Sequence, residues 1–187
     1  MNNVCIVCHG RSLTGKKLAA FIDSHDCVIR MANCDWQNRA DYGEKYDIGI
    51  YTPQLIRFAR DASWLPKKWW NYCPDENHKT RIEEYRGIQS VSFGSVVEKW
   101  HAKDCKHYSR GTAAIIIAAE TLPVSEIVVV GADMVKWGTT QPAEERHPDA
   151  LQKTRKSVGR SNTHQWDIEG QIARTICQGY DIMLTMV

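Results

Sequence analysis

The side chain best placed for acid–base chemistry is that of His164, which opens the last predicted helix. Asn162 to Gln165 has the spacing of a capping sequence, and we expect the helix to end at Gly179. A histidine in the first turn lies near the positive end of the helix dipole, which disfavours its charged form. A neutral imidazole can act as a general base near pH 7, and Asp167 is spaced to orient the ring. On this pattern alone, a surface histidine beside a helix cap is the simpler interpretation.

The start of the chain predicts a strand–loop–helix–strand unit. Val4–Cys8 is a short apolar run typical of a buried strand, and Lys16–Asp23 has a plausible helix face. Cys27–Met31 is expected to be the second strand. In such units the loop after the first strand, here His9 to Ser12, faces the ligand. This loop is not a G-x-G-x-x-G sequence, so an ordinary dinucleotide site is not expected.

A second helix–strand pair lies later in the chain. Ser109–Leu122 is expected to be a buried helix with a small-residue entry, and Glu126–Gly131 a core strand. The backbone N–H groups of Arg110, Gly111 and Thr112 would then be free to bind an anion. A plain helix cap explains this entry equally well.

Strands and helices are expected to alternate through the remaining chain. The further strands are Tyr46–Tyr51, Lys68–Cys73, Ile88–Val91 and Asp181–Met186, and the further helices are Gln54–Asp61, Pro74–Tyr85 and Ser95–His101. This alternation predicts one Rossmann-like α/β domain over residues 1–187, with a mainly parallel sheet and helices on both faces.

The composition is that of an ordinary globular chain. It has 187 residues, 43% hydrophobic and 25% charged, with a net charge of +2 that does not indicate nucleic acid as a partner. The chain has no apolar run long enough for a membrane span and no signal-peptide layout, so we expect a cytoplasmic protein. Its seven scattered cysteines suit a reducing compartment.

Two local patterns have competing interpretations. Trp64 to Trp70 is aromatic and basic together; we expect tryptophans that fill the core, and the alternative is a stacking platform for a sugar or base. Cys5-Ile-Val-Cys8-His9 matches a haem-attachment pattern. We reject that interpretation because the two cysteines fall in a predicted buried strand and point to opposite faces.

Several motifs together resemble those of sialyltransferases. DSHDCVIRMANC (residues 23–34), followed by Ala40–Lys45 and Tyr51, resembles their large motif, and HGRSL resembles a loop of the bacterial members. SRGTAAIIIAAETLPVSEIVVVGADM resembles the small motif, and His164 with Glu169 fits the H-x-x-x-x-E of the very small motif. The resemblance covers most of the chain, implies a GT-A-like variant of the fold, and suggests a bacterial or phage enzyme because no membrane anchor is visible.

The resemblance implies an inverting glycosyltransferase that moves sialic acid or a related sugar from a CMP-type donor to a glycan or other hydroxyl acceptor. His164 would be the base, and Glu169, well around the helix from it, would be structural. His147 lies where a third family motif has a histidine; contact with the leaving phosphate and a plain loop histidine are equal alternatives. No D-x-D sequence occurs, so we expect no metal and no other cofactor. The donor-binding residues would be His9, Gly10, Arg11, Ser12, Asn33, Ser109, Arg110, Gly111 and Thr112.

The sequence departs from the family at two places. His9 stands where the family has asparagine, and Ala32 stands where a second asparagine is expected, with Asn33 one residue on. The family's disulfide is not expected, because Val124 lies near the place of the second cysteine. The departures leave two alternatives open: a nucleotide or nucleotide-sugar binding protein without transfer activity, or a phage-type glycosyltransferase that modifies nucleic acid.

The segment from about 138 to 161 has little apolar periodicity, two prolines and a basic run. A solvated loop is the ordinary interpretation of such a run, and a lid that closes over phosphates is the sharper one. Nothing in the sequence indicates the oligomeric state.

Overall fold

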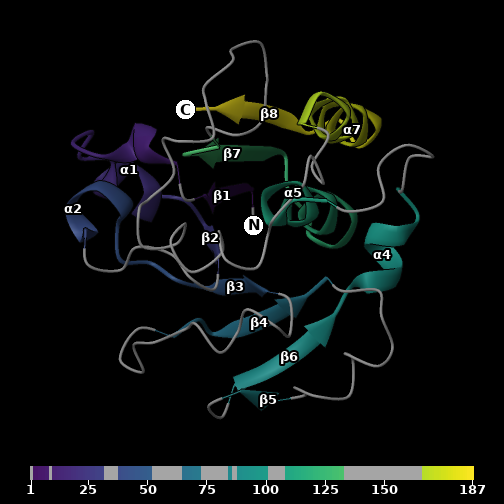
Figure 1. Ribbon diagram of the computed structural model, residues 1–187, viewed down its shortest axis with the longest axis horizontal. Coiled ribbons are helices and arrows are strands. Elements are labelled where there is room, and N and C mark those ends of the chain that lie inside the picture. Colours follow the sequence, from purple (N-terminus) through teal and green to yellow (C-terminus); the bar gives the residue numbers. More distant parts are fainter. Residues whose placement is uncertain are drawn as a thin grey trace, which may run out of the picture.

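The computed structural model describes residues 2–8, 10–31, 38–51, 65–72, 84–85, 88–100, 108–132 and 166–187. Its strands form one sheet, and its helices lie around that sheet (Figure 1). The strands are β1 (Asn3–Val7), β2 (Cys27–Met31), β3 (Ile48–Tyr51), β4 (Lys68–Asn71), β5 (Glu84–Tyr85), β6 (Ile88–Ser92), β7 (Glu126–Val130) and β8 (Met183–Met186). The helices are α1 (Ala19–Asp23), α2 (Arg39–Tyr42), α4 (Gly94–Glu98), α5 (Arg110–Thr121) and α7 (Trp166–Gly179), with a 3-10 helix, η1 (Arg11–Leu13).

The sheet has eight strands in the order β5-β6-β4-β3-β2-β1-β7-β8. All of its described strand pairs are parallel except β5 with β6, which confirms the predicted α/β fold with a mainly parallel sheet. From β1 the chain builds outward through β2, β3, β4 and β6, then returns to the other side of β1 with β7 and β8. The order therefore reverses between β1 and β7. Ligands of open α/β sheets bind outside the carboxyl ends of the strands at such a reversal.

Helices cover both faces of the sheet. Along β1, Val4 and Ile6 point to the face covered by α5 and α7, whereas Cys5 and Val7 point to the face covered by α1. This alternation follows from the two-residue period of a strand, and both sets are fully buried because the sheet has a helical layer on each side. Figure 1 shows α5 and α7 on one side of β1 and β7, with α1 and α2 on the other.

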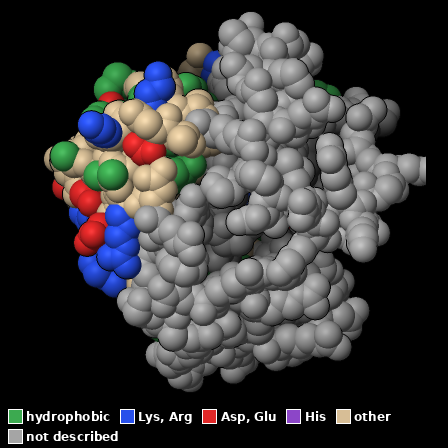
Figure 2. Space-filling model, turned by 60° about the vertical axis from the view of Figure 1, so that its left-hand side comes forward, with side chains coloured by type: hydrophobic (Ala, Val, Ile, Leu, Met, Phe, Trp, Pro, Cys, Tyr) green, Lys and Arg blue, Asp and Glu red, His purple; other side chains and the backbone are tan. Residues whose placement is uncertain are grey.

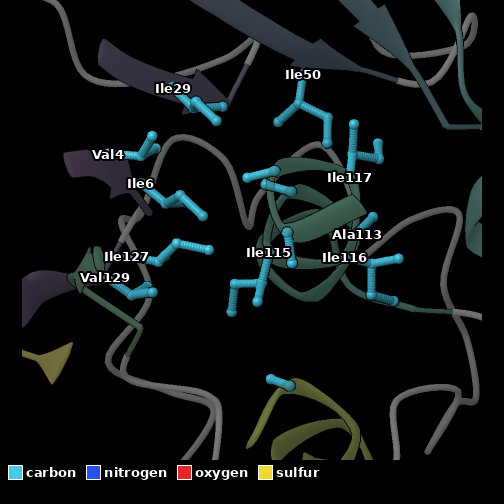
Figure 3. Close-up of a cluster of buried hydrophobic side chains, with 14 of the residues drawn as sticks. Val4, Ile6, Ile29, Ile50, Ala113, Ile115, Ile116, Ile117, Ile127 and Val129 are labelled. Atoms are coloured by element: carbon cyan, nitrogen blue, oxygen red, sulfur yellow. The ribbon is translucent and has the colours of Figure 1, made fainter. Parts of the chain in front are cut away.

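The larger core lies under α5. Ile115, Ile116 and Ile117 are β-branched and weakly favour helix, yet they lie in the middle of this helix because their burial outweighs that preference. Figure 3 shows α5 facing a layer of apolar side chains from the central strands, including Ile6 and Ile127. Burying one such isoleucine contributes about 1.5–3 kcal/mol. The sheet centre and α5 therefore form a rigid base for the residues at their ends.

Most predicted elements lie close to their expected positions. The strand at Cys27–Met31 has the predicted bounds, and the predicted strands at 4–8, 46–51, 68–73, 126–131 and 181–186 are each one or two residues shorter or shifted. The predicted core role of the tryptophans is confirmed for Trp69 and Trp70, which are buried. The helix predicted at 54–61 lies outside the described residues.

Two local predictions were wrong, and one helix was missed. The helix expected from Lys16 begins only at Ala19, because Lys17 has a left-handed φ of 54° that no α-helix accepts. A helix was expected to reach Tyr85, but Glu84–Tyr85 is the short strand β5, paired antiparallel with β6. The helix α2 was not predicted at all, since four residues are too few to show a helical period.

A helix must be long and apolar to cross a lipid bilayer. Among these residues, no helix combines the length and the apolar character needed to cross a membrane.

Candidate functional site

The loop after β1 begins at the reversal of the sheet. The N–H of Cys8 donates to the Val130 carbonyl at 2.9 Å, and the N–H of Gly10 donates to the Gly131 carbonyl at 2.8 Å. Gly131 has a φ of +67°, and a Cβ there would lie 2.7 Å from Leu13 Cδ1. Only glycine therefore fits this close approach, which fixes the start of the Gly10–Ser12 segment on the end of β7.

The entry of α5 lies against the end of β1. A Cβ added to Gly111 would lie 3.1 Å from Cys8 Sγ, tighter than most real Cβ contacts. The structure thus brings together the two segments predicted to bind the donor, the loop after β1 and the Ser109–Thr112 entry. A polar loop and a helix N-terminus at the same edge of a parallel sheet form an arrangement that suits an anionic ligand.

The prediction of free N–H groups at this entry was partly wrong. Ser109 is the N-cap of α5, and its Oγ accepts from the N–H of Thr112 at 3.2 Å. The Ser109 and Thr112 hydroxyl oxygens also lie 2.9 Å apart. The N–H of Thr112 therefore caps the helix, as serine commonly arranges, and does not remain available for a ligand.

A buried carboxylate completes this entry. Glu169 of α7 is fully buried, and its Oε2 accepts from the N–H of Ser109 at 2.9 Å and from the hydroxyl of Thr112 at 2.6 Å. A buried charge needs such donors, and the positive end of the α5 dipole favours it further. Glu169 thus has the structural role expected for it, and it ties the start of α7 to the start of α5.

The partner of Glu169 was not identified from the sequence. The signal available was a Ser-x-x-Thr helix entry together with a carboxylate in the apolar stripe of the last helix, at the position before Gly170. That pattern indicates a buried acceptor but does not say which donors it meets.

Two residues of α2 reach the loop after β1, and the sequence did not point to them as site residues. Tyr42 is buried and its hydroxyl donates to the Gly10 carbonyl at 3.2 Å. Asp41 accepts from the N–H groups of Gly15 at 2.6 Å and Lys17 at 2.8 Å. These backbone hydrogen bonds hold the pKa of Asp41 below its ordinary value.

The other residues that carry the large-motif resemblance build a support beside the sheet. Arg30 in β2 is fully buried, and its Nε donates to the Lys45 carbonyl at 2.7 Å, while Nη2 lies 3.7 Å from Asp23 Oδ1. The Asp23 carboxylate accepts from the N–H groups of Glu44 and Lys45. Gly43 is required there, because a Cβ would lie 2.4 Å from Asp23 Oδ1. This part of the motif joins α1, β2 and the segment after α2.

The buried cysteines of the two strands at the centre of the sheet are unreactive. Cys5, Cys27 and Cys177 are buried thiols outside any disulfide. Burial raises the pKa of Cys5 and of Cys27 to about 12, so both thiols stay protonated at neutral pH. Cys5 packs on the α1 face and Cys8 on the α5 face, as predicted from the strand period.

Several predicted site residues lie outside the described residues. These are His9, Asn33, His147, His164 and the whole predicted lid at 138–161. Asp167 is at the start of the described part of α7, but its side chain, like that of Arg11, is not described. Within the described ranges, no group of His, Cys, Asp and Glu side chains is arranged to hold a metal ion, and metal independence stays a prediction.

The fold is similar to that of solved sialyltransferases. No protein-family model matches the sequence, and no curated protein matches it. A crystal structure of a mammalian sialyltransferase superposes with a TM-score of 0.63 and 15% sequence identity, over 98% of this chain and 68% of that one. A mammalian sialyltransferase in complex with Gal-beta-1-3GalNAc-ortho-nitrophenol gives a TM-score of 0.60, with the same identity and coverage. At this identity the likeness shows that the chain has a sialyltransferase-like fold.

Proposed function

We propose that this protein is a metal-independent, inverting glycosyltransferase that transfers sialic acid or a related sugar from a CMP-type donor to an acceptor hydroxyl. One observation supports this above the others: the loop after β1 and the α5 entry meet at the reversal of a sheet whose fold is sialyltransferase-like. The motif order of the sequence assigns the donor to these two segments. Glu169 links the α5 entry to α7, and His164 precedes that helix by two residues in the sequence.

The proposed reaction is a single displacement. His164 takes the proton of the acceptor hydroxyl as that oxygen attacks the anomeric carbon of the donor. The bond from this carbon to the phosphate oxygen breaks, and the nucleoside monophosphate leaves with the bonding electrons. Attack and departure on opposite faces invert the anomeric centre. Asp167 orients the imidazole.

The leaving phosphate is stabilised by groups of the chain itself. In this proposal the N–H groups at the α5 entry, the loop at Gly10–Ser12 and His147 surround it, and the basic segment at 153–156 closes over it as part of the lid. Preorganised donors of this kind replace the divalent cation that other glycosyltransferases use.

Nucleotide-dependent thermal stability tests the proposal directly. CMP, CDP, UMP and CMP-sialic acid are each added to the protein, with and without a chelator, and the melting temperature is measured. A ligand at 100 times its Kd stabilises the fold by about 2.7 kcal/mol. We expect cytidine nucleotides to raise the melting temperature equally with and without chelator. A shift that the chelator abolishes would contradict metal independence, and no shift with any nucleotide would contradict the donor assignment.

A nucleotide-binding protein without transfer activity is the second candidate. The replacement of two family asparagines by His9 and Ala32 favours it, because both positions belong to the donor-binding part of the family motifs. Formation of free sugar or transferred product from CMP-sialic acid separates the two candidates, since only the enzyme releases CMP from the sugar.

The described surface does not favour the nucleic-acid alternative. In the described part of the face shown in Figure 2, Asp and Glu side chains lie among the Lys and Arg side chains. Exposed Arg39 forms an ion pair with exposed Glu44, with Nη1 3.3 Å from Oε1. A nucleic-acid surface instead gathers basic residues of one sign.

A further inference from the structure

The loop between η1 and α1 is held by one buried side chain from α2. Asp41 is 4% exposed, and both of its carboxylate oxygens accept backbone hydrogen bonds from this loop. Oδ2 accepts from Gly15 N–H at 2.6 Å, and Oδ1 accepts from Lys17 N–H at 2.8 Å. Asn38 donates from Nδ2 to Oδ2 at 2.7 Å and so fixes the orientation of the carboxylate.

The two loop residues that Asp41 binds have left-handed backbones. Gly15 has a φ of 77°, which glycine adopts freely, but Lys17 has a φ of 54°, which a residue with a Cβ avoids. Strained backbone persists only where the surroundings enforce it, and such strain gathers at functional loops. The contact that enforces it here is the bond from Lys17 N–H to Asp41.

The helix α2 also holds the residue just before η1, so that it contacts both ends of the Gly10–Lys17 segment. Tyr42, next to Asp41, is buried, and its hydroxyl donates to the Gly10 carbonyl at 3.2 Å. Thus α2 fixes the segment from Gly10 to Lys17 at both ends. This segment contains Gly10, Arg11 and Ser12, the residues assigned to the donor.

Core packing alone does not require these hydrogen bonds from Asp41 and Tyr42 to the Gly10–Lys17 segment. Leu13 is 1% exposed and anchors the middle of the segment, but residues 14–17 after it are exposed and contribute nothing apolar to the core. A buried carboxylate that orders an exposed, strained segment is therefore better explained by a need to shape that segment than by a need to fill space.

We propose that Asp41, supported by Tyr42, is a positioning residue that pre-forms the Gly10–Lys17 loop for the phosphate side of the donor. This inference rests on the proposed function for the identity of the ligand, but not for the shape of the loop. Without the carboxylate, the loop samples other conformations, and donor binding must select the competent one. If a tenth of the molecules remain competent, the apparent Kd rises about tenfold.

The first experiment measures the loop without any ligand. Hydrogen exchange of the amides at Gly15 and Lys17 is compared in the wild type, Asp41→Asn and Asp26→Asn. Asp26 is the matched control, because its carboxylate accepts backbone N–H bonds from Asn2 at 2.6 Å and Asn3 at 3.5 Å, at the amino end of β1. We expect the two loop amides to lose protection in Asp41→Asn and to keep it in Asp26→Asn.

The second experiment measures binding and turnover with defined probes. CMP binding is titrated by calorimetry, and kcat and KM are measured with CMP-sialic acid. For Asp41→Asn we expect about a tenfold rise in the Kd of CMP and in KM, with kcat little changed. Adding Lys17→Gly should restore most of the affinity, because glycine adopts the left-handed backbone without the carboxylate. Tyr42→Phe, which keeps the core ring, should weaken CMP binding in the same direction and by less.

The outcomes separate this inference from the proposed function. If the wild type does not bind CMP but Asp41→Asn loosens the loop, the donor assignment is wrong, and Asp41 is still shown to determine the shape of the loop. If loop protection or CMP affinity in Asp41→Asn equals that of the wild type, the positioning role is wrong. The same holds if Asp26→Asn raises the Kd as much, because the effect would then be general loss of stability. Should Asp41→Asn not fold, an unchanged CMP affinity in Tyr42→Phe would overturn the inference.

Discussion

A single imidazole, that of His164, carries the chemical step of the proposed reaction. The structure describes the residue five positions later, Glu169, which is buried and bound to the α5 entry. In the proposal the two residues thus have different tasks: His164, two positions before α7 in the sequence, supplies the base, and Glu169 fixes the start of α7 in place. Mutations at the two positions should therefore differ in kind, with one affecting turnover and the other affecting stability.

Replacing His164 by alanine should remove the general base. We expect kcat to fall by about 10² to 10⁴-fold, because that is the usual contribution of a positioned base. The Kd of CMP should stay within about a factor of two, a change of less than half a kcal/mol, because the base faces the acceptor. The acidic limb of the pH–rate profile should also disappear, and initial rates over a pH series measure this.

A matched control comes from the last turn of α7. Gln178 is exposed in the last turn of α7, so Gln178→Ala should leave both kcat and the Kd unchanged. Near-normal turnover in His164→Ala would overturn the assignment. Loss of CMP binding with a normal fold would instead place His164 in donor recognition.

Single residues were predictable from the sequence only where a local pattern marked them. Ser109 as a helix cap and Gly10 as a turn residue follow from residue type and spacing. The partners of Asp41 and Glu169 do not, because a buried carboxylate meets donors from segments far away in the sequence. Their contacts become visible only when the elements are packed.

At the scale of elements, α5 and α7 are joined at their starts by one carboxylate. Ser109 and Thr112 both donate to Oε2 of Glu169, so the removal of that atom takes the acceptor from two donors at the α5 entry. Apolar residues of α7 such as Ala173 and Ile176 complete the contact with the α5 core. The angle between the two helices therefore depends on one polar contact in addition to apolar packing.

Glu169→Ala should consequently destabilise the fold by about 2–4 kcal/mol, because hydrogen bonds to charged groups are strong and two donors lose their acceptor. Glu169→Gln keeps an oxygen at the same place and should cost clearly less. Chemical denaturation measures both. Glu98→Ala, at an exposed position of α4, is the control and should change the free energy of unfolding by less than about 0.5 kcal/mol. An alanine variant as stable as this control would show that the contact contributes nothing.

Elements with a clear period were predictable, and those shaped by a distant partner were not. Burial on both faces of the sheet gives β1, β2 and β7 continuous apolar sequences, which made these strands predictable. The helix α5 was predictable because its long run of apolar residues is buried. The late start of α1 was missed, because Lys17 is held out of the helix by Asp41. The predicted lid at 138–161 lies outside the described residues and stays a prediction.

For the whole molecule, two aspartates predict a loss of stability in acid. Backbone hydrogen bonds hold the pKa of Asp26 and of Asp41 below the ordinary value in the folded state. A carboxylate with a lowered folded pKa stabilises the fold above its unfolded pKa of about 3.9, and this contribution is lost as the pH falls through the folded pKa. The melting temperature should therefore be nearly constant from pH 7 to about pH 5 and should fall steeply below about pH 4.

The variant Asp26→Asn/Asp41→Asn tests that explanation. It should melt lower than the wild type at pH 7, because both charge-assisted contacts are gone, and the difference should shrink as the pH falls. Calorimetric scans at a series of pH values measure the difference. A constant difference over the whole series would mean that these carboxylates do not titrate with folding.

The whole fold was predicted better than the site. Alternating strands and helices predicted the mainly parallel sheet, and the order of three motifs led to the sialyltransferase-like fold that the structural likeness supports. The strand order was not readable, because no local signal shows that β7 returns to the far side of β1. That return places Gly131 against Leu13 and forms the edge at which the loop after β1 begins.

The pairing of β1 with β7 also sets the order of events when the chain folds. Val4 pairs with Ile127, so the two central strands come from opposite ends of a long stretch of chain. Contacts between such distant segments form slowly, because closing the large loop between them costs conformational entropy before the contacts stabilise the fold. A nascent chain on the ribosome can order β1 beside β2 early, but it must wait for β7 before the edge with Gly10 and Gly131 exists. If nucleotide binds at this edge, as proposed, it cannot assist the early stages of folding and can bind only molecules in which β1 and β7 are already paired.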